Sequence, residues 1–112
     1  MKSSPHDYYL APASVFLAFG YSQLGDYISA EEASHTATEL MGGTPSFWMP
    51  YINALAVNKK PDEAQRAVIE LLRISPGITL EHMEWIFKMG FTSEEGVESL
   101  VSGLRTLDWS KS

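Results

Sequence analysis

The sequence has 112 residues, of which 45% are hydrophobic and 20% charged, and its formal net charge is -6. This length and hydrophobic content fit one folded domain and exclude the disordered class. We expect no binding to nucleic acid, because phosphate backbones are bound mainly through lysine and arginine. The chain has no cysteine, which excludes disulfides and thiolate chemistry. No secretory signal and no apolar run of the roughly 18 residues that span a bilayer are present, so we expect a cytoplasmic protein that does not enter membranes.

Apolar residues at helical spacing predict a first helix over 12–24, which Pro12 opens. The Gly25-Asp26-Tyr27 turn is expected to stop it. A second helix is predicted over about 30–41, with Gly42-Gly43 at its end. The predicted apolar residues of these two helices are Val15, Phe16, Phe19 and Leu24, and then Ala30, Ala33, Ala37, Leu40 and Met41.

Thr44 and Pro45 suit the N-cap and first position of a third helix, in which Pro50 is expected to loosen the opening turn. A charged corner at 59–62 then leads into a fourth helix, where Asp62 and Glu63 suit the positive N-terminus. The apolar faces of the two helices are predicted to be Trp48, Ile52, Leu55 and Ala56, and then Ala64, Ala67, Val68, Leu71 and Leu72.

Thr79 is the predicted N-cap of a fifth helix that ends at Gly90, and Thr92 with Glu95 reads as a capping box for a sixth helix reaching Leu107. We expect Trp85 to pack within the chain and Trp109 to lie at a frayed end. The predicted apolar residues are Leu80, Met83, Ile86 and Phe87 for the fifth helix, and Val97, Leu100, Val101, Leu104 and Leu107 for the sixth.

The chain contains an internal repeat. Ala33 and Ala37 precede Pro45 at the same spacing at which Ala64 and Val68 precede Pro76. With the aromatic and leucine residues before each stretch, this pattern resembles the tetratricopeptide repeat family. The resemblance implies an all-α fold of antiparallel helix hairpins stacked as a short right-handed superhelix, with about six helices in one domain. Its parts would be a first repeat at 11–45, a second at 46–76 and a C-terminal capping hairpin at 79–107, stacked through Ala33, Ala37, Ala64 and Ala67.

A second resemblance concerns residues 71 to 107, which are similar to the terminal part of repeat arrays in bacterial multidomain proteins. The last helix there ends in a Gly-Leu-Arg motif, matched by Gly103-Leu104-Arg105. This resemblance implies that the chain is the C-terminal segment of a larger bacterial regulatory protein.

The family resemblance also implies a concave groove lined by the first helix of each repeat, where a peptide or a partner helix binds. In peptide-binding relatives, an asparagine at the position of Asn53 holds the ligand backbone. The alternatives are that Asn53 is an ordinary exposed residue, and that the groove is covered by the segment around Tyr8 to Leu10 or by another subunit. The partner-binding positions carried over in this way are Val15, Phe19, Ser22, Met49, Asn53 and Ala56.

Nothing in the sequence predicts catalysis. His6, His35 and His82 have no second ligand at metal-binding spacing, so we expect no metal and no cofactor. Glu81-His82-Met83-Glu84 places a base between two acids, but this pattern is typical of a solvated helix face. We therefore expect that the chain is not an enzyme and that it is a non-catalytic module that binds a protein or peptide. The alternative is a homodimerisation module without a separate ligand.

Overall fold

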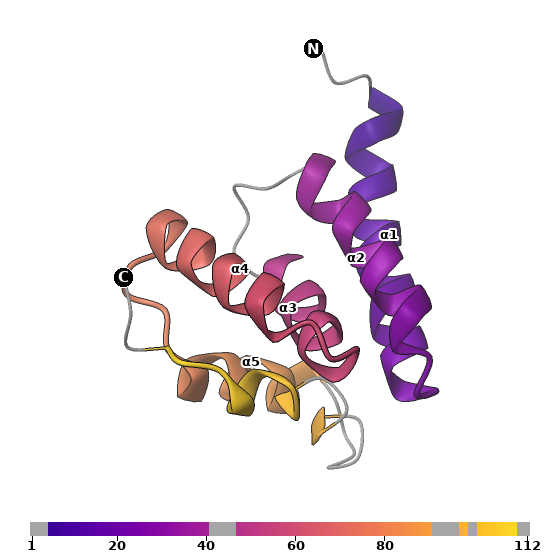
Figure 1. The fold of residues 1–112 in the computed structure, drawn as a ribbon. Coiled ribbons are helices and arrows are strands. Elements are labelled where there is room, and N and C mark those ends of the chain that lie inside the picture. The colour runs from indigo at the N-terminus through magenta and orange to yellow at the C-terminus, as the bar shows by residue number, and fades with distance from the viewer. Residues whose placement is uncertain (1–4, 41–46, 91–96, 99–100, 110–112) are drawn as a thin grey trace.

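The computed structural model describes residues 5–40, 47–90, 97–98 and 101–109, with side chains from residue 13 on except at 86, 87 and 90. All regular structure within these residues is helical, as predicted (Figure 1). The predicted Gly42-Gly43 end, the Thr44-Pro45 cap and the Thr92–Glu95 capping box lie outside the described residues. The helices are α1 (Pro5–Gln23), α2 (Tyr27–Leu40), α3 (Trp48–Val57), α4 (Pro61–Ile74), α5 (Leu80–Gly90) and the 3-10 helix η2 (Leu104–Thr106).

Helix α1 begins at Pro5, so the prediction that Pro12 opens it is wrong. Pro5 occupies the first helical position, where a missing N–H is not a loss, because that group has no partner within the helix. The helix continues through Pro12, which removes one backbone hydrogen bond. Nineteen residues of helix evidently outweigh that single loss.

The turn between α1 and α2 lies where the sequence predicted it. Gly25 has a φ of +80°, which is open to glycine at little cost. Helix α2 starts at Tyr27, earlier than predicted, because Asp26 acts as its cap: the Ser29 N–H donates to Asp26 Oδ1 at 3.1 Å.

Helices α3 and α4 form the second hairpin. Pro50 lies in the first turn of α3, where its missing N–H is tolerated, and the helix runs through it. Lys59 turns the corner with a φ of 63°, and Pro61 then takes the first position of α4. The predicted face of α4 is confirmed, since every one of its members is buried: Ala64, Ala67, Val68, Leu71 and Leu72.

The Thr79 cap of α5 is also confirmed, because the His82 N–H donates to Thr79 Oγ1 at 3.1 Å. The predicted sixth helix does not reach Leu107. Residues 97, 98 and 101 are helical, but the chain turns at 102–103 and forms η2. Trp109 is not frayed: it packs against the core, and its ring N–H donates to the Leu104 carbonyl at 2.8 Å.

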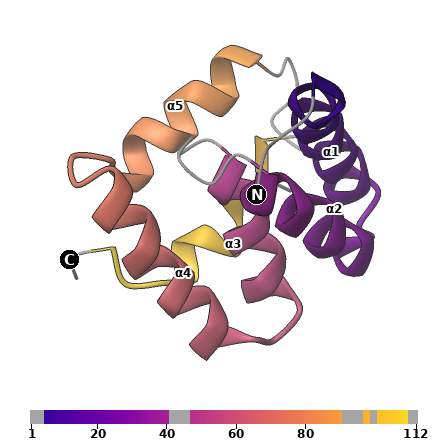
Figure 2. The same ribbon diagram turned by 90° about the horizontal axis from the view of Figure 1, so that it is seen from above.

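The two hairpins lie side by side, with α2 against α3 and α1 touching α3 as well (Figures 1 and 2). Residues 101–109 lie beside α3, α4 and α5, to which they are hydrogen-bonded or ion-paired. Among the described residues, the large apolar side chains that are fully buried belong to α3, α4, α5 and the C-terminal residues, and they are Met49, Ile52, Leu55, Leu71, Met83 and Leu104, with Val68 and Val101. The main core therefore lies beneath α3 and α4 rather than within the first hairpin.

The first hairpin buries small residues. Ala18 of α1 and Ala30 and Ala37 of α2 are fully buried, and buried serines donate their hydroxyls to carbonyls of their own helix. Ser22 Oγ donates to the Ala18 carbonyl at 2.8 Å, and Ser34 Oγ to the Ala30 carbonyl at 2.6 Å. Small side chains let two helices approach closely, but they bury little apolar surface.

A polar clasp ties the two hairpins together. Lys60 Nζ lies 2.8 Å from Glu31 Oε2, and Asn58 Nδ2 donates to Glu31 Oε1 and to the Tyr27 carbonyl, both at 2.9 Å. Glu31 belongs to α2, while the other two side chains flank the corner between α3 and α4. Burial raises the pKa of Glu31, but the hydrogen bonds from Lys60 and Asn58 outweigh it, so the pKa lies below its ordinary value of 4.5.

This lowered pKa predicts a pH-dependent contribution to stability. A carboxylate with a lowered pKa stabilises the fold above its unfolded-state pKa, and the effect is lost as the pH falls through the folded-state pKa. We expect Glu31→Gln to lower the free energy of unfolding by about 1 kcal/mol at pH 7. The difference from the intact chain should vanish near pH 2.5. Urea denaturation of both proteins at the two pH values measures it.

Glu32→Gln is the matched control, because Glu32 is the next residue, is exposed and forms no ion pair with any described residue. It should match the intact chain at both pH values. A deficit of Glu31→Gln that is equally large at pH 7 and pH 2.5 would contradict the clasp.

Candidate interaction surface

The six predicted groove positions face the interior of the chain. Phe19 and Ala56 are partly buried and pack against the core. The other four are buried, and they are Val15, Ser22, Met49 and Asn53. These side chains serve packing within the chain, so in this structure they do not line an open groove.

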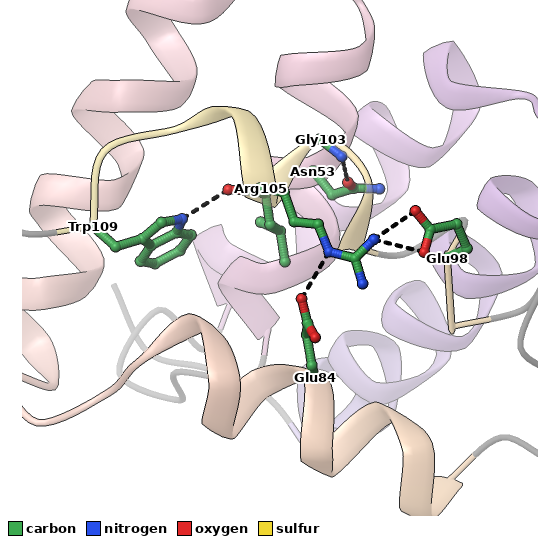
Figure 3. Close-up of polar contacts among 7 residues, drawn as sticks. Asn53, Glu84, Glu98, Gly103, Arg105 and Trp109 are labelled. Atoms are coloured by element: carbon green, nitrogen blue, oxygen red, sulfur yellow. Dashed lines mark hydrogen bonds and ion pairs between the residues drawn. The ribbon is translucent and has the colours of Figure 1, made fainter.

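Asn53 does hold a backbone, as the family resemblance implied, but that backbone belongs to the same chain. Its side chain is fully buried, and its Oδ1 accepts the Gly103 N–H at 2.7 Å (Figure 3). Gly103 approaches so closely that a Cβ built there would lie 2.6 Å from the Asn53 carbonyl oxygen and 3.0 Å from Ala56 Cβ. The Gly103-Leu104-Arg105 motif therefore docks directly on the Asn53 side of α3.

Further polar contacts hold the C-terminal segment in place. Arg105 Nε lies 2.8 Å from Glu84 of α5, and its Nη1 lies 2.6 Å from Glu98 (Figure 3). Gln65 of α4 donates to the Asp108 carbonyl at 2.7 Å and accepts the Asp108 N–H at 3.0 Å. The segment is thus bonded to α3, α4 and α5 at once.

We expect Gly103→Ala to destabilise the protein by about 2 kcal/mol, because backbone oxygen, not a flexible side chain, blocks the added methyl group. Gly103 has a φ of -71°, so the loss would be steric and not conformational. Chemical denaturation followed by circular dichroism measures the free energy of unfolding.

Gly77→Ala is the control, since a Cβ there meets no atom within 4 Å. Its free energy of unfolding should stay within about 0.5 kcal/mol of that of the intact chain. Equal stabilities of the two variants would contradict the close approach of Gly103 to α3.

The outer face of α1 is apolar and exposed. We define it by Phe16, Leu17, Gly20 and Leu24, which fall within about 100° of one another around the helix. Leu17 lies at the edge of this face, where it also lines a hollow against α2. The exposed fractions are 73% for Phe16, 55% for Leu17 and 82% for Leu24. Phe16 and Leu24 were predicted to belong to the inward stripe, and that prediction is wrong.

The reason lies in the composition of α1. The sequence from Tyr8 to Gly25 contains no charged residue, so apolar residues occur all round the helix. Periodicity alone cannot choose the inward face of such a helix. The missing polar face was nevertheless a usable signal, because a helix that is apolar all round is ordinarily covered on every side.

The candidate acid–base side chains are either bonded to a neighbour or exposed. Glu84 holds Arg105, and His82 stacks on Trp85 with 5.9 Å between ring centroids. Trp85 is 57% exposed, so the expectation that it packs within the chain is wrong. The side chain of His6 lies outside the described residues. Among the residues that are described, no three His, Asp or Glu side chains are grouped to hold a metal ion.

A membrane-crossing helix is not found in the part of the chain that the structure describes. Comparisons with protein families, curated proteins and solved structures returned no match to this chain. The resemblance to tetratricopeptide repeats therefore stays a prediction.

Proposed function

We propose that this chain is a non-catalytic protein-interaction module, and that the outer face of α1 binds an apolar helix or peptide of a partner. The observation that supports this is an inversion of the usual pattern. Helix α1 buries small residues such as Ala18 and Ser22, while Phe16, Leu17 and Leu24 are exposed.

Covering this face is energetically worthwhile. Burying a Leu or Phe side chain fully contributes roughly 1.5–3 kcal/mol. Even at partial exposure, three such side chains supply on the order of 5 kcal/mol before the entropic cost of association is subtracted. Three large apolar residues on one side of a helix also form a surface on which the apolar face of an amphipathic partner helix can pack.

The wider proposal keeps the tetratricopeptide arrangement. Two hairpins in which α2 packs on α3 and α1 touches α3 are compatible with successive repeats at 11–45 and 46–76. In this proposal the docked segment around Gly103 belongs to the predicted capping hairpin at 79–107 and covers the end of the second repeat. In this proposal the module belongs to a larger cytoplasmic regulatory protein of bacteria, as the terminal motif suggested.

Homodimerisation is the second candidate. The chain carries a net charge of -6, and two copies repel one another over most surfaces. The outer face of α1 lies in the charge-free run, so two copies that meet there bring no like charges into the contact.

Light scattering after size exclusion, over a hundredfold concentration range, separates the two candidates. We expect the intact chain to be a monomer and to capture a partner from bacterial lysate. The double variant Phe16→Glu, Leu24→Glu should weaken that capture about tenfold or more, because it places two charges in the contact. Both residues are exposed, so the free energy of unfolding should change by less than about 0.5 kcal/mol.

Trp85→Glu is the matched control, since it adds a charge at an exposed aromatic residue of α5. It should leave partner capture intact. A concentration-dependent dimer that only the α1 variant dissociates would establish the second candidate. A double variant that behaves like the intact chain in both assays would refute both.

A further inference from the structure

Two hollows lie between α2 and the second hairpin. They are open hollows with volumes of about 610 Å³ and 500 Å³. His35 of α2 and Tyr51 of α3 line both hollows, so the two meet along these side chains. We call the combined feature the α2–α4 groove, because the second hollow extends to α4. It is separate from the outer face of α1.

Aromatic rings form the centre of the groove. The rings of His35 and Tyr51 lie 5.3 Å apart and are tilted by 42°. Trp48 meets Tyr51 edge-on at 6.2 Å. The side chains of Trp48 and Tyr51 are only partly buried. Partly exposed faces of Trp and Tyr attract cations through their ring quadrupoles.

Carboxylates surround these rings. Five glutamates line the groove against two bases, Lys60 and Arg66, and they are Glu31, Glu32, Glu39, Glu63 and Glu70. Lys60 is engaged by Glu31 in the clasp, and Glu70 pairs with Arg73 outside the groove. Arg66 is exposed and offsets only part of the charge that remains.

Glu39 and Glu63 both line the second hollow, together with Trp48 and Tyr51. Glu39 pairs with His35 at 3.1 Å, and Glu63 forms no ion pair with any described residue. Burial raises the pKa of Tyr51, and Glu31, Glu63 and Glu39 raise it further, while Lys60 opposes them. Negative potential from both sides of the groove thus converges on the Tyr51 ring.

We propose that the α2–α4 groove binds a basic peptide segment of a partner, with an arginine side chain placed against Trp48 and Tyr51 and bonded to Glu39 and Glu63. Arginine fits better than lysine. Its planar guanidinium stacks on aromatic rings and donates two hydrogen bonds to one carboxylate at the same time. The net negative charge of the lining selects against acidic segments.

The test uses fluorescein-labelled peptides in which serine alternates with arginine, lysine or glutamate. Fluorescence anisotropy with the full chain, at low and at physiological salt, gives their dissociation constants. We expect the arginine peptide to bind about threefold or more tightly than the lysine peptide, and the glutamate peptide not to bind. Equal affinity for arginine and lysine peptides would overturn the assignment to arginine.

Charge-matched variants separate the groove from general attraction to an acidic protein. Glu63→Gln and Glu39→Gln should each weaken binding of the arginine peptide about fivefold. Glu81→Gln removes the same charge from α5, outside the groove, and should weaken it less than about twofold. Equal weakening by Glu81→Gln and Glu63→Gln would overturn the site.

The aromatic contribution needs a variant that keeps bulk but removes the ring. Tyr51→Leu should weaken binding of the arginine peptide about fivefold. Because Tyr51 also packs against the core, its thermal unfolding is compared with that of the intact chain, and binding is measured where both are folded. Unchanged affinity in folded Tyr51→Leu would overturn the stacked arginine.

The double variant Phe16→Glu, Leu24→Glu tests the groove separately from the outer face of α1, on which the proposed function rests. It should bind the arginine peptide as the intact chain does. Loss of peptide binding in that variant alone would place the peptide on the outer face of α1 and overturn the groove.

Discussion

The contact between Gly103 and Asn53 determines how the second half of the molecule is organised. The buried Asn53 amide accepts the Gly103 N–H, and Gly103 has no room for a Cβ. Together these two features fix the C-terminal segment on α3. Once that segment is fixed, Val101 and Leu104 enter the main core, and Arg105 reaches Glu84 and Glu98. Removing the Asn53 acceptor would leave a buried N–H without a partner, which is costly. This contact, together with the pairs made by Arg105 and Gln65, thus holds the C-terminal segment against the core beneath α3 and α4.

The same contact explains why the predicted groove is closed. In a repeat array that binds peptides, an asparagine at this position would bond to a ligand backbone. Here the chain's own segment supplies the backbone, and Ala56 lies against it. The exposed apolar face of α1 and the α2–α4 groove, where we propose that partners bind, lie elsewhere.

Features that depend on local sequence were predictable. The face of α4, the Thr79 cap and the Gly25 turn follow from periodicity, capping chemistry and glycine's freedom at positive φ. The docking of 101–109 was not predictable, because η2 and Trp109 pack against residues distant in sequence. The orientation of α1 was not predicted either, because the helix has no charged face and buries small residues such as Ala18 and Ser22 while Phe16 and Leu24 are exposed. For the same reason the sequence did not show that Asn53 would accept the Gly103 N–H of its own chain.

The outer face of α1 and the α2–α4 groove differ in charge, and this difference determines which kind of partner each could recognise. The outer face of α1 lies within a run without charged residues, and its proposed partner would gain by losing contact with water. Five glutamates line the α2–α4 groove with Tyr51 and Trp48, and its proposed partner would gain by neutralising charge. The first contact should persist in high salt, whereas the second should weaken, because salt screens exposed charges and not apolar burial. Salt dependence thus identifies which surface a given partner occupies.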